Sequence, residues 1–437
     1  MLLPITSTVD DTGMLHIAGC SAKSLQEKYG TPVYIMDVAT IKEQCSQYRS
    51  SFDFDDLESE IIYASKAFSS IAICQLIAEQ GLSIDVSTGG ELFVALESGF
   101  DPARIYFHGN NKSLQEIQYG LESNVGTFVV DNLDELEQLA SLADKQQKKQ
   151  DIFLRITPGI KASTHEYIQT GKIESKFGFG IHKSIASQAV KKALEYGSLN
   201  LVGLHSHIGS QIFNLSSYEK LIDVMLKFIH SVNTTMGAGI AELNIGGGLG
   251  ISYTRQDKPP AISEFADLVH NAVSRYGARH GVKLKKIYLE PGRSIVGNAG
   301  ITLYEAGTIK HIPHVKNYIS VDGGMSDNIR PILYQARYDA FLAERMNDRF
   351  PSATYTIVGK HCESGDILIE GIDLPIINKG DLIAITATGA YCYSMASNYN
   401  GQTKSAVVAV EDGQSWPWIE RQSYQDLVAH NKELYEK

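Results

Sequence analysis

A lysine stands just beyond a run of residues that has the character of a buried strand. In IIYASKAFSS, residues 61–70, four residues from Ile61 to Ala64 lead to Lys66. A lysine amine that is withdrawn from water can lose its proton and attack an aldehyde, with which it forms a Schiff base. We therefore interpret Lys66 as a candidate nucleophile, and we expect its side chain to be desolvated.

Three consecutive glycines follow a second apolar run, in NIGGGLG, residues 244–250. Glycines let backbone N–H groups approach an anion closely, so the loop predicts a phosphate-bearing ligand. A tight turn that needs positive φ is the alternative explanation. The pattern is not GxGxxG, because Ile251 stands where the last glycine would be, and GxxxxGK[ST] does not occur. Nucleotide-binding motifs are therefore absent.

Pyridoxal phosphate would supply both the aldehyde for Lys66 and the phosphate for the glycine loop. Glu290, in LEPGR, could keep the pyridine nitrogen of that cofactor protonated, so that the ring accepts electron density. His205 and His207, in HSHIGS, share one face of a strand, and one of them could pack on the ring. A metal pair is the rival interpretation. No third ligand stands at a diagnostic spacing, so no metal site is predicted, and a hydrogen-bonded histidine is the default for His205.

The elements that must position these residues alternate between strands and helices. Eight segments have the character of strands: IIYASKA, LSIDVS, RIYFHG, GTFVVDN, IFLRITP, LVGLHSHIGS, ELNIGGG and IYLEPG. The segments 71–81, 89–99 and 133–149 space apolar residues three and four apart, as helices that cover a sheet do. Eight such alternations predict an α/β fold, a parallel (β/α)8 barrel of the TIM type.

Active sites of such barrels lie at the C-terminal ends of the strands. A single polar residue at a strand end is usually a solvated loop residue or a helix cap. Eight strands in succession that end in this way instead favour an active site. The residues at these ends are Lys66, Asp85, His108, Asp131, Arg155, His207, Gly246 to Gly248 and Glu290.

From residue 294 onward the pattern changes to short strands separated by Gly, Pro and Asp turns, as in DILIEGIDLPIINKGDLIAITATGAYCYS. This pattern predicts an antiparallel β domain. The first 35 residues are assigned to it as well, because they include part of the strand-like TPVYIMDV. We thus expect a cofactor-binding barrel at 36–293 and a β-sandwich or β-barrel-like domain from 1–35 and 294–437.

Composition narrows the possible partners. The 437 residues carry a formal net charge of -11, which opposes binding to nucleic acid. No run of about 18 apolar residues and no signal-like start occurs, so neither a membrane span nor export is expected. The five cysteines form no CxxC pair and suggest neither disulfides nor zinc. A small-molecule substrate and a cytoplasmic location are expected.

With these residues assembled, the sequence resembles the meso-diaminopimelate decarboxylases, fold-type III pyridoxal-phosphate enzymes of lysine biosynthesis. The resemblance runs nearly from end to end. It rests on YASKAFSS, DVSTGGEL, HGNNKS, LRITPGIKASTHEYIQTGKIESKFGFGI, HSHIGSQIF, NIGGGLGISY, EPGRSIVG, VDGGMSDNIRPILYQA, CESGD and GAYCYSMASNYN. It implies decarboxylation of meso-2,6-diaminopimelate to L-lysine and CO2 through a pyridoxal-phosphate Schiff base. It also implies a homodimer with shared active sites, in which the β domain of one subunit completes the barrel of the other.

The resemblance further implies a role for individual residues. Lys66 matches the Schiff-base lysine, and Cys362 matches a proton donor that reaches across from the other subunit. The positions matching cofactor contacts are Lys66, Asp85, His207, Ser210, Gly247, Gly248, Glu290, Gly292, Arg293 and Tyr391. The positions matching substrate contacts are Arg293, Arg330, Tyr334, Glu363 and Tyr391.

Substrate choice depends on charge. Diaminopimelate has a distal carboxylate, which suits a forked cation, and a distal ammonium, which suits an acid; Arg330 and Glu363 offer both. The rivals are decarboxylases of the same fold that act on arginine, ornithine or carboxynorspermidine, and an alanine-racemase-like barrel. The racemase is disfavoured because it has an arginine where this chain has Glu290. A non-catalytic, pyridoxal-phosphate-binding regulator is a rival of another class, which has no need of Lys66, Cys362 and Glu290 together.

Overall fold

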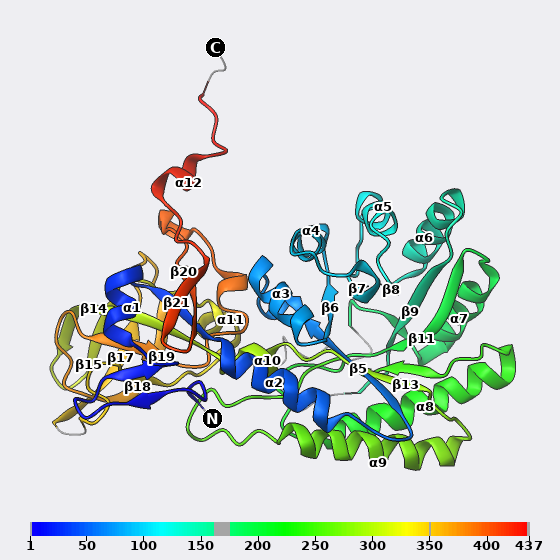
Figure 1. Ribbon diagram of the computed structural model, residues 1–437, viewed down its shortest axis with the longest axis horizontal. Helices are drawn as coiled ribbons and strands as arrows, with labels where there is room; N and C mark the ends of the chain where they lie inside the picture. The colour runs from blue at the N-terminus through cyan, green and yellow to red at the C-terminus, as the bar shows by residue number, and fades with distance from the viewer. Residues whose placement is uncertain (1, 161–174, 349–350, 435–437) are drawn as a thin grey trace. The chain divides into compact units, whose positions relative to one another are not determined.

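Two compact units make up the chain in the computed structural model, which describes residues 2–160, 175–348 and 351–434 (Figure 1). The barrel unit comprises residues 44–250 and 258–294, and the β unit comprises residues 1–43, 251–257 and 295–437. Among the described residues, no helix has both the length and the apolar character that crossing a membrane requires.

Eight parallel strands close the barrel, which confirms the predicted fold. They are β5 (Glu58–Ala64), β6 (Ser83–Val86), β7 (Ile105–Phe107), β8 (Thr127–Val130), β9 (Gln150–Thr157), β11 (Leu199–His205), β12 (Glu242–Asn244) and β13 (Lys286–Leu289). Each strand pairs in parallel with the next, and β13 pairs with β5 to complete the ring. The short β10 (Phe179–Gly180) pairs with β9 as well.

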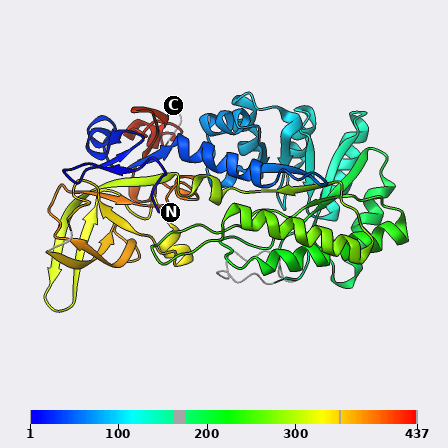
Figure 2. The same ribbon diagram turned by 60° about the horizontal axis from the view of Figure 1, so that its bottom comes forward.

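Helices surround the barrel strands, and the long helices α8 and α9 pack side by side (Figure 2). The barrel helices are α3 (Ile71–Glu79), α4 (Gly89–Glu97), α5 (Leu114–Glu122), α6 (Leu133–Lys145), α7 (Ile185–Glu195), α8 (Ser216–Met236) and α9 (Ile262–His280), with the 3-10 turns η1 (Ser65–Ala67), η2 (Pro102–Arg104) and η4 (His182–Ser184). The side chains of Ser70, Thr88, Ser113 and Asn132 cap the first four of these helices. Each cap satisfies an N–H group of the first helical turn, so each of these loops ends at a defined residue.

Large side chains fill the interior of the barrel. Ile62, Tyr106, Val129, Phe153 and Tyr288 form one buried cluster contributed by five of the strands. The barrel is therefore a packed core rather than a pore, and a ligand site can form only at the ends of its strands.

The β unit is built around a large sheet that is mostly antiparallel. Its strands are β4 (Val33–Asp37), β14 (Gly300–Ile312), β15 (Lys316–Val321), β16 (Ala340–Leu342), β17 (Ser352–Val358), β18 (Ile367–Pro375), β19 (Leu382–Ile385), β20 (Ala406–Glu411) and β21 (Gln414–Ile419). Two pairings are parallel, β15 with β17 and β20 with β4, which the turn-rich sequence did not indicate. Strand β4 comes from the start of the chain and lies between β14 and β20.

Smaller elements complete the β unit. A three-stranded sheet is formed by β1 (Thr8–Val9), β2 (Leu15–Ile17) and β3 (Cys20–Ser21). The helical elements are α1 (Ala22–Tyr29), α11 (Arg330–Tyr334), α12 (Tyr424–Val428), η5 (Tyr393–Met395) and η6 (Tyr399–Gly401), while α2 (Val38–Ser51) and α10 (Arg293–Val296) run across the boundaries of the two units. Residues of β2, β4, β14, β19 and β20 form the hydrophobic core beneath the large sheet.

Candidate active site

Lys66 lies on the one-turn helix η1, directly after the first barrel strand. Ser65 and Ala67 on either side of it are buried, whereas the side chain of Lys66 itself is exposed. The expectation of a desolvated lysine is therefore wrong for the single chain, because β5 ends at Ala64 and Lys66 stands two residues beyond it. The positive charge of Lys66 nevertheless influences the pKa values of Asp85 and two rim histidines, so its ammonium group lies close to them.

Asp85, on strand β6, is buried beside this turn. Its Oδ1 accepts a hydrogen bond of 3.3 Å from the N–H of Ser65. Burial raises the pKa of Asp85 well above its ordinary value, the negative charge of Glu290 raises it further, and Lys66 opposes the shift. This carboxyl group thus has a strong tendency to hold a proton.

Glu290 follows β13 and is held by three side chains from other strands. Its Oε1 lies 2.9 Å from Nε2 of His108 and accepts a 2.8 Å hydrogen bond from the amide of Asn244. Its Oε2 lies 3.1 Å from Nε2 of His205. Although burial favours the neutral form, the two histidines lower the pKa of Glu290 well below its ordinary value. Glu290 is therefore an ionised, buried carboxylate.

The nearest groups to Glu290 could be mistaken for a metal site. Ligand atoms of His108, His205 and Glu290 lie within 4.8 Å of one another. However, both imidazole Nε2 atoms lie at hydrogen-bond distance from carboxylate oxygens, which can only accept a proton. A nitrogen that carries a proton cannot ligate a metal. We therefore interpret His205 and Glu290 as a hydrogen-bonded pair rather than as metal ligands, with Nε2 of His108 in contact with the carboxylate. The alternative that the sequence suggested for His205, a hydrogen-bonded histidine, agrees with this geometry.

His207 lies two residues beyond the end of β11. Burial, followed by the positive charges of Lys66 and Arg155, lowers the pKa of His207 well below its ordinary value. The imidazole is consequently uncharged at neutral pH, and an uncharged ring can stack on a planar aromatic ligand.

The glycine loop after β12 has no room for side chains. A Cβ on Gly247 would come within 2.0 Å of the backbone oxygen of Glu290, and one on Gly248, where φ is +121°, would come within 2.3 Å of the oxygen of Gly209. The hydroxyl of Tyr218 donates a 3.0 Å hydrogen bond to the carbonyl of Gly247. The sequence interpretation of a close backbone approach is therefore consistent with the packing of this loop.

Two further side chains lie at the neighbouring strand ends. Nη2 and Nε of Arg293 donate hydrogen bonds of 2.7 and 3.2 Å to the hydroxyl of Ser210. Arg293 is only 5% exposed. Within the described residues, the N–H of the buried Gly247 donates no hydrogen bond. A buried cation, a hydroxyl and an unused N–H donor are the groups that an anion such as phosphate requires.

Gly292 joins this region to the lysine turn. A Cβ on Gly292 would lie 2.9 Å from the Cβ of Ala64 and 3.0 Å from that of Ala67. The N–H of Ala64 also donates a 3.0 Å hydrogen bond to the carbonyl of Pro291. The segment that carries Glu290 thus packs directly against the turn that carries Lys66.

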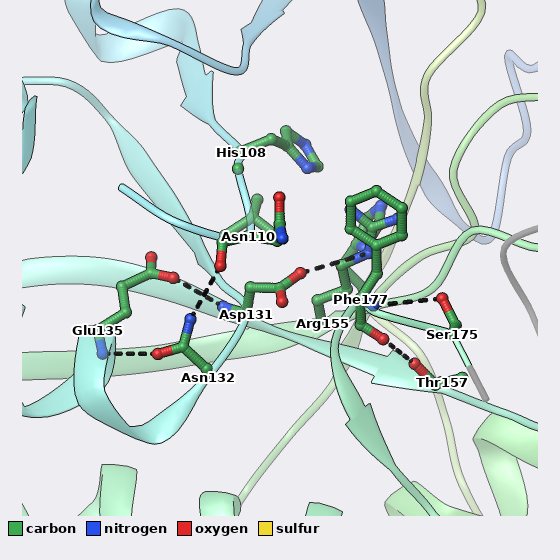
Figure 3. Close-up of polar contacts among 12 residues, drawn as sticks. His108, Asn110, Asp131, Asn132, Glu135, Arg155, Thr157, Ser175 and Phe177 are labelled. Atoms are coloured by element: carbon green, nitrogen blue, oxygen red, sulfur yellow. Dashed lines mark hydrogen bonds and ion pairs between the residues drawn. The ribbon is translucent and has the colours of Figure 1, made fainter. Parts of the chain in front are cut away.

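Asp131 and Arg155 lie at the ends of β8 and β9. Figure 3 shows the Arg155 side chain between Asp131 and the ring of Phe177, with Nε 3.9 Å from Oδ1 of Asp131 and the guanidinium 4.4 Å from the ring centroid. Arg155 also exerts its charge on His205, His207 and the other buried groups of the rim. It is a source of positive potential that sequence reasoning placed at the rim without a role.

The β unit holds a second cluster of predicted site residues around Arg330. Its guanidinium lies 5.6 Å from the ring centroids of both Tyr334 and Tyr391, and 5.3 Å from that of Tyr253. Its Nε donates a 2.8 Å hydrogen bond to the hydroxyl of Tyr338. Arg330 is 6% exposed. Among the described residues, no carboxylate forms an ion pair with it.

Cys362 and Glu363 lie in the same unit, on the loop between β17 and β18, and both are exposed. The N–H of Cys362 donates a 2.9 Å hydrogen bond to the side chain of Asn400. The carboxylate of Asp366 accepts hydrogen bonds from the N–H groups of His361 (2.9 Å) and Met325 (2.6 Å), which anchor the loop.

The predicted residues thus form two groups, one in the barrel unit and one in the β unit. The barrel unit brings together Lys66, Asp85, His207, Ser210, Gly247, Gly248, Glu290, Gly292 and Arg293, and the β unit brings together Arg330, Tyr334 and Tyr391. Sequence reasoning did not assign roles to His108, Asn244, Tyr253 and Tyr338. The sequence placed His108 at a strand end without a role, whereas nothing in the spacing of the other three marks them.

Comparison with known families identifies the type of site. The family described as "Pyridoxal-dependent decarboxylase, pyridoxal binding domain" matches residues 38–297. The chain belongs to this family. Its range in the chain includes all the barrel residues discussed above, and the buried anion site and the ionised Glu290 fit the phosphate and ring nitrogen of a pyridoxal cofactor.

Relatives within the pyridoxal-dependent decarboxylase family match nearly the whole chain. The diaminopimelate decarboxylase of Bacillus subtilis is 45% identical over 98% of this chain and 97% of its own length. That of Synechocystis is 45% identical over 98% of this chain and 92% of its own. The crystal structure of diaminopimelate decarboxylase from M. jannaschii in complex with L-lysine superposes with a TM-score of 0.92 at 34% identity, covering 99% of both chains.

Proposed function

We propose that the protein decarboxylates meso-2,6-diaminopimelate to L-lysine and CO2, the last step of lysine biosynthesis, in the cytoplasm. Pyridoxal 5'-phosphate is the proposed cofactor. The near-complete match to relatives named diaminopimelate decarboxylase supports the reaction, as does a related structure that holds L-lysine, the proposed product.

The barrel residues are proposed to hold the cofactor. Lys66 would bind it covalently through its amine, while Ser210, Gly247, Gly248 and Arg293 would bind the phosphate and Tyr391 would add a further contact. When bound, pyridoxal phosphate withdraws electron density from the substrate carbon as CO2 leaves. Gly292 contributes by allowing the Glu290 segment to pack on the Lys66 turn.

Two buried groups, Glu290 and Asp85, and the partly exposed His207 would then act on the cofactor ring from fixed positions. Glu290 is an ionised acceptor for the ring nitrogen, and His207 offers an uncharged ring for stacking. Asp85, whose pKa is raised by burial, can hold or release a proton beside Lys66. Their burial excludes water and strengthens each electrostatic interaction.

The observation that carries the choice of substrate is the buried Arg330, which no described carboxylate neutralises. A buried charge is costly unless it is paired, so this guanidinium is suited to a carboxylate supplied by the substrate. Diaminopimelate retains a distal carboxylate after the reacting one is lost, whereas ornithine has none. Tyr334 and Tyr391, which flank the guanidinium, and Arg293 and Glu363 would complete substrate binding.

We further propose a homodimer with shared active sites. The β unit of one subunit would complete the barrel site of the other, and Cys362 would donate the proton that replaces CO2. The exposure of Cys362 and Glu363 in the single chain supports this proposal, because both remain available to a partner.

The deciding experiment is CO2 release from purified protein with pyridoxal phosphate. Four substrates are compared: meso-diaminopimelate, ornithine, arginine and carboxynorspermidine. Release from the first alone is expected. Release from another substrate alone would overturn the assignment of Arg330, and cofactor binding without release from any substrate would favour a non-catalytic regulator.

Shared sites can be tested by subunit exchange. Lys66→Ala and Cys362→Ala proteins are each expected to be inactive, and a mixture is expected to recover activity because each heterodimer regains one intact site. Heterodimer formation is verified with two affinity tags. Verified heterodimers without activity would contradict the role of Cys362 across the interface.

A further inference from the structure

Side chains from three different strand ends contact the Glu290 carboxylate. His108 follows β7, Asn244 ends β12 and His205 ends β11. All three side chains are buried, with residue exposures of 6%, 0% and 1%, and Glu290 itself is 7% exposed. Residues so far apart in sequence converge on one carboxylate only through closure of the barrel.

The geometry leaves part of the carboxylate available. An ionised carboxylate has about four acceptor positions on its two oxygens. Asn244 occupies a position on Oε1 at 2.8 Å and His205 occupies one on Oε2 at 3.1 Å, whereas Nε2 of His108 lies 2.9 Å from Oε1 without the geometry of a hydrogen bond. At least one acceptor position, on Oε2, therefore remains for a further donor.

Burial also fixes the protonation of the two histidines. It lowers the pKa of His205 to about 4 and lowers that of His108, so both rings are uncharged at neutral pH. Each ring then carries one proton, and the hydrogen bond of His205 to the acceptor Glu290 places the proton of that ring on Nε2. In keeping with this tautomer, Nδ1 of His205 is buried and has no hydrogen-bond partner among the described residues.

We propose that His205 and Asn244, through their hydrogen bonds, and His108, through its contact with Oε1, are positioning residues that keep the Glu290 carboxylate ionised and oriented, so that a proton shared with the cofactor's ring nitrogen stays on the nitrogen. This inference rests on the proposed function, in which Glu290 pairs with that nitrogen. The two hydrogen-bond donors and the adjacent imidazole of His108 lower the proton affinity of the carboxylate, so the nitrogen becomes the more basic of the two groups. A protonated ring withdraws electrons more strongly, which the decarboxylation requires.

Other charged groups near this cluster act in both directions. Lys66 and Arg155 add positive potential, whereas Asp85 adds negative potential when it is ionised. The uncharged His207 adds none. The two cations act through space, whereas His205 and Asn244 hydrogen-bond to Glu290 directly.

The test uses the holoenzyme reconstituted with pyridoxal phosphate that carries 15N at the ring nitrogen, because the 15N chemical shift reports whether the nitrogen is protonated. His205→Leu removes one hydrogen-bond donor, and His108→Leu removes the imidazole that lies against Oε1. His205→Gln and His108→Gln are matched controls that retain an N–H group near the position of Nε2. Urea unfolding verifies that each variant is folded, and a leucine variant that fails this check is replaced by the other.

In the wild type and the glutamine variants, a protonated nitrogen is expected. In the leucine variants, the resonance should move toward the unprotonated position, and kcat should fall at least tenfold, or about 1.4 kcal/mol. The double variant that carries both His205→Leu and Glu290→Gln should have the same kcat as Glu290→Gln alone, because His205 acts through the carboxylate.

The 15N measurement separates the role of the positioning residues from the pairing of Glu290 with the ring nitrogen. A fully protonated nitrogen in the leucine variants would overturn this inference while leaving the proposed function intact, provided that Glu290→Gln alone removes the proton. If Glu290→Gln itself leaves the nitrogen protonated, the assigned pairing of Glu290 with the nitrogen is wrong, and the inference falls with it.

Discussion

Replacing Arg330 by alanine tests the substrate assignment most directly. The guanidinium is 6% exposed and is held by a hydrogen bond to Tyr338 and by three tyrosine rings. If it binds the distal carboxylate of diaminopimelate, Arg330→Ala leaves that carboxylate in a buried position without its partner. The variant should therefore lose substrate use and retain its cofactor.

The size of the loss follows from the burial. Truncating one partner of a buried, hydrogen-bonded charge pair costs about 2–5 kcal/mol. That cost corresponds to a fall in kcat/KM of roughly 30- to 5,000-fold. We expect about 100-fold, in the lower half of this range, because water can enter the space left by the arginine side chain and solvate the carboxylate. Arg330→Lys should recover only part of the loss, because an ammonium lacks the forked donors of a guanidinium.

The assay compares two quantities in the same preparations. CO2 release gives kcat/KM for diaminopimelate, and equilibrium dialysis gives the dissociation constant of pyridoxal phosphate. Arg337→Ala is the matched control, since Arg337 is an exposed arginine seven residues further along the chain. The control should stay within threefold of wild type for both quantities.

A second comparison isolates the distal carboxylate. L-Lysine, the proposed product, retains this group, whereas cadaverine is the same diamine without a carboxylate, so the ratio of cadaverine binding to L-lysine binding should change toward unity in Arg330→Ala. Equal losses of cofactor affinity and kcat/KM would refute the assigned role, as would an unchanged ratio between the two ligands.

Three further predictions concern neighbouring residues. Tyr338→Phe removes the acceptor for Nε of Arg330 and should lower kcat/KM about fivefold, or about 1 kcal/mol, without changing the affinity for pyridoxal phosphate; an unchanged kcat/KM would show that the hydroxyl does not orient the arginine. Gly247→Ala places a Cβ 2.0 Å from a backbone oxygen and should destabilise the protein by about 3 kcal/mol in urea unfolding. The control Gly197→Ala, whose Cβ would have no atom within 4 Å, should change the free energy of unfolding by less than about 0.5 kcal/mol. Similar losses of stability in both variants would argue against close packing of the glycine loop. Burial lowers the pKa of His205 to about 4, so between pH 6.5 and 4 the unfolded chain binds a proton that the folded chain does not. The free energy of unfolding should therefore decrease as the pH is lowered through this window, by up to about 1.4 kcal/mol per pH unit. His205→Gln should weaken this pH dependence, as measured by urea titrations at several pH values.

The sequence by itself determined the barrel and much of its rim. The spacing of apolar residues in each segment is a local property, so eight strands and their helices could be identified without coordinates, and the strand ends named Lys66, Asp85 and Glu290 in advance. The three glycines of NIGGGLG are likewise a local signal, because glycine is needed wherever the backbone must closely approach another group. The resemblance to a known family then supplied roles that no local pattern contains.

Only the tertiary structure decided which of these residues meet and how they are protonated. The convergence of His108, Asn244 and His205 on Glu290 depends on the closure of the barrel, which brings β7, β11 and β12 together with β13. The enclosure of Arg330 by Tyr253 and Tyr338 joins positions that no sequence spacing relates. Solvent exposure is likewise a property of the assembled surface, so Lys66 could be expected to be buried from its strand-like neighbours and yet stand exposed on the turn that follows them. Burial and pKa depend on what surrounds a group in three dimensions, and the chain order alone does not contain that information.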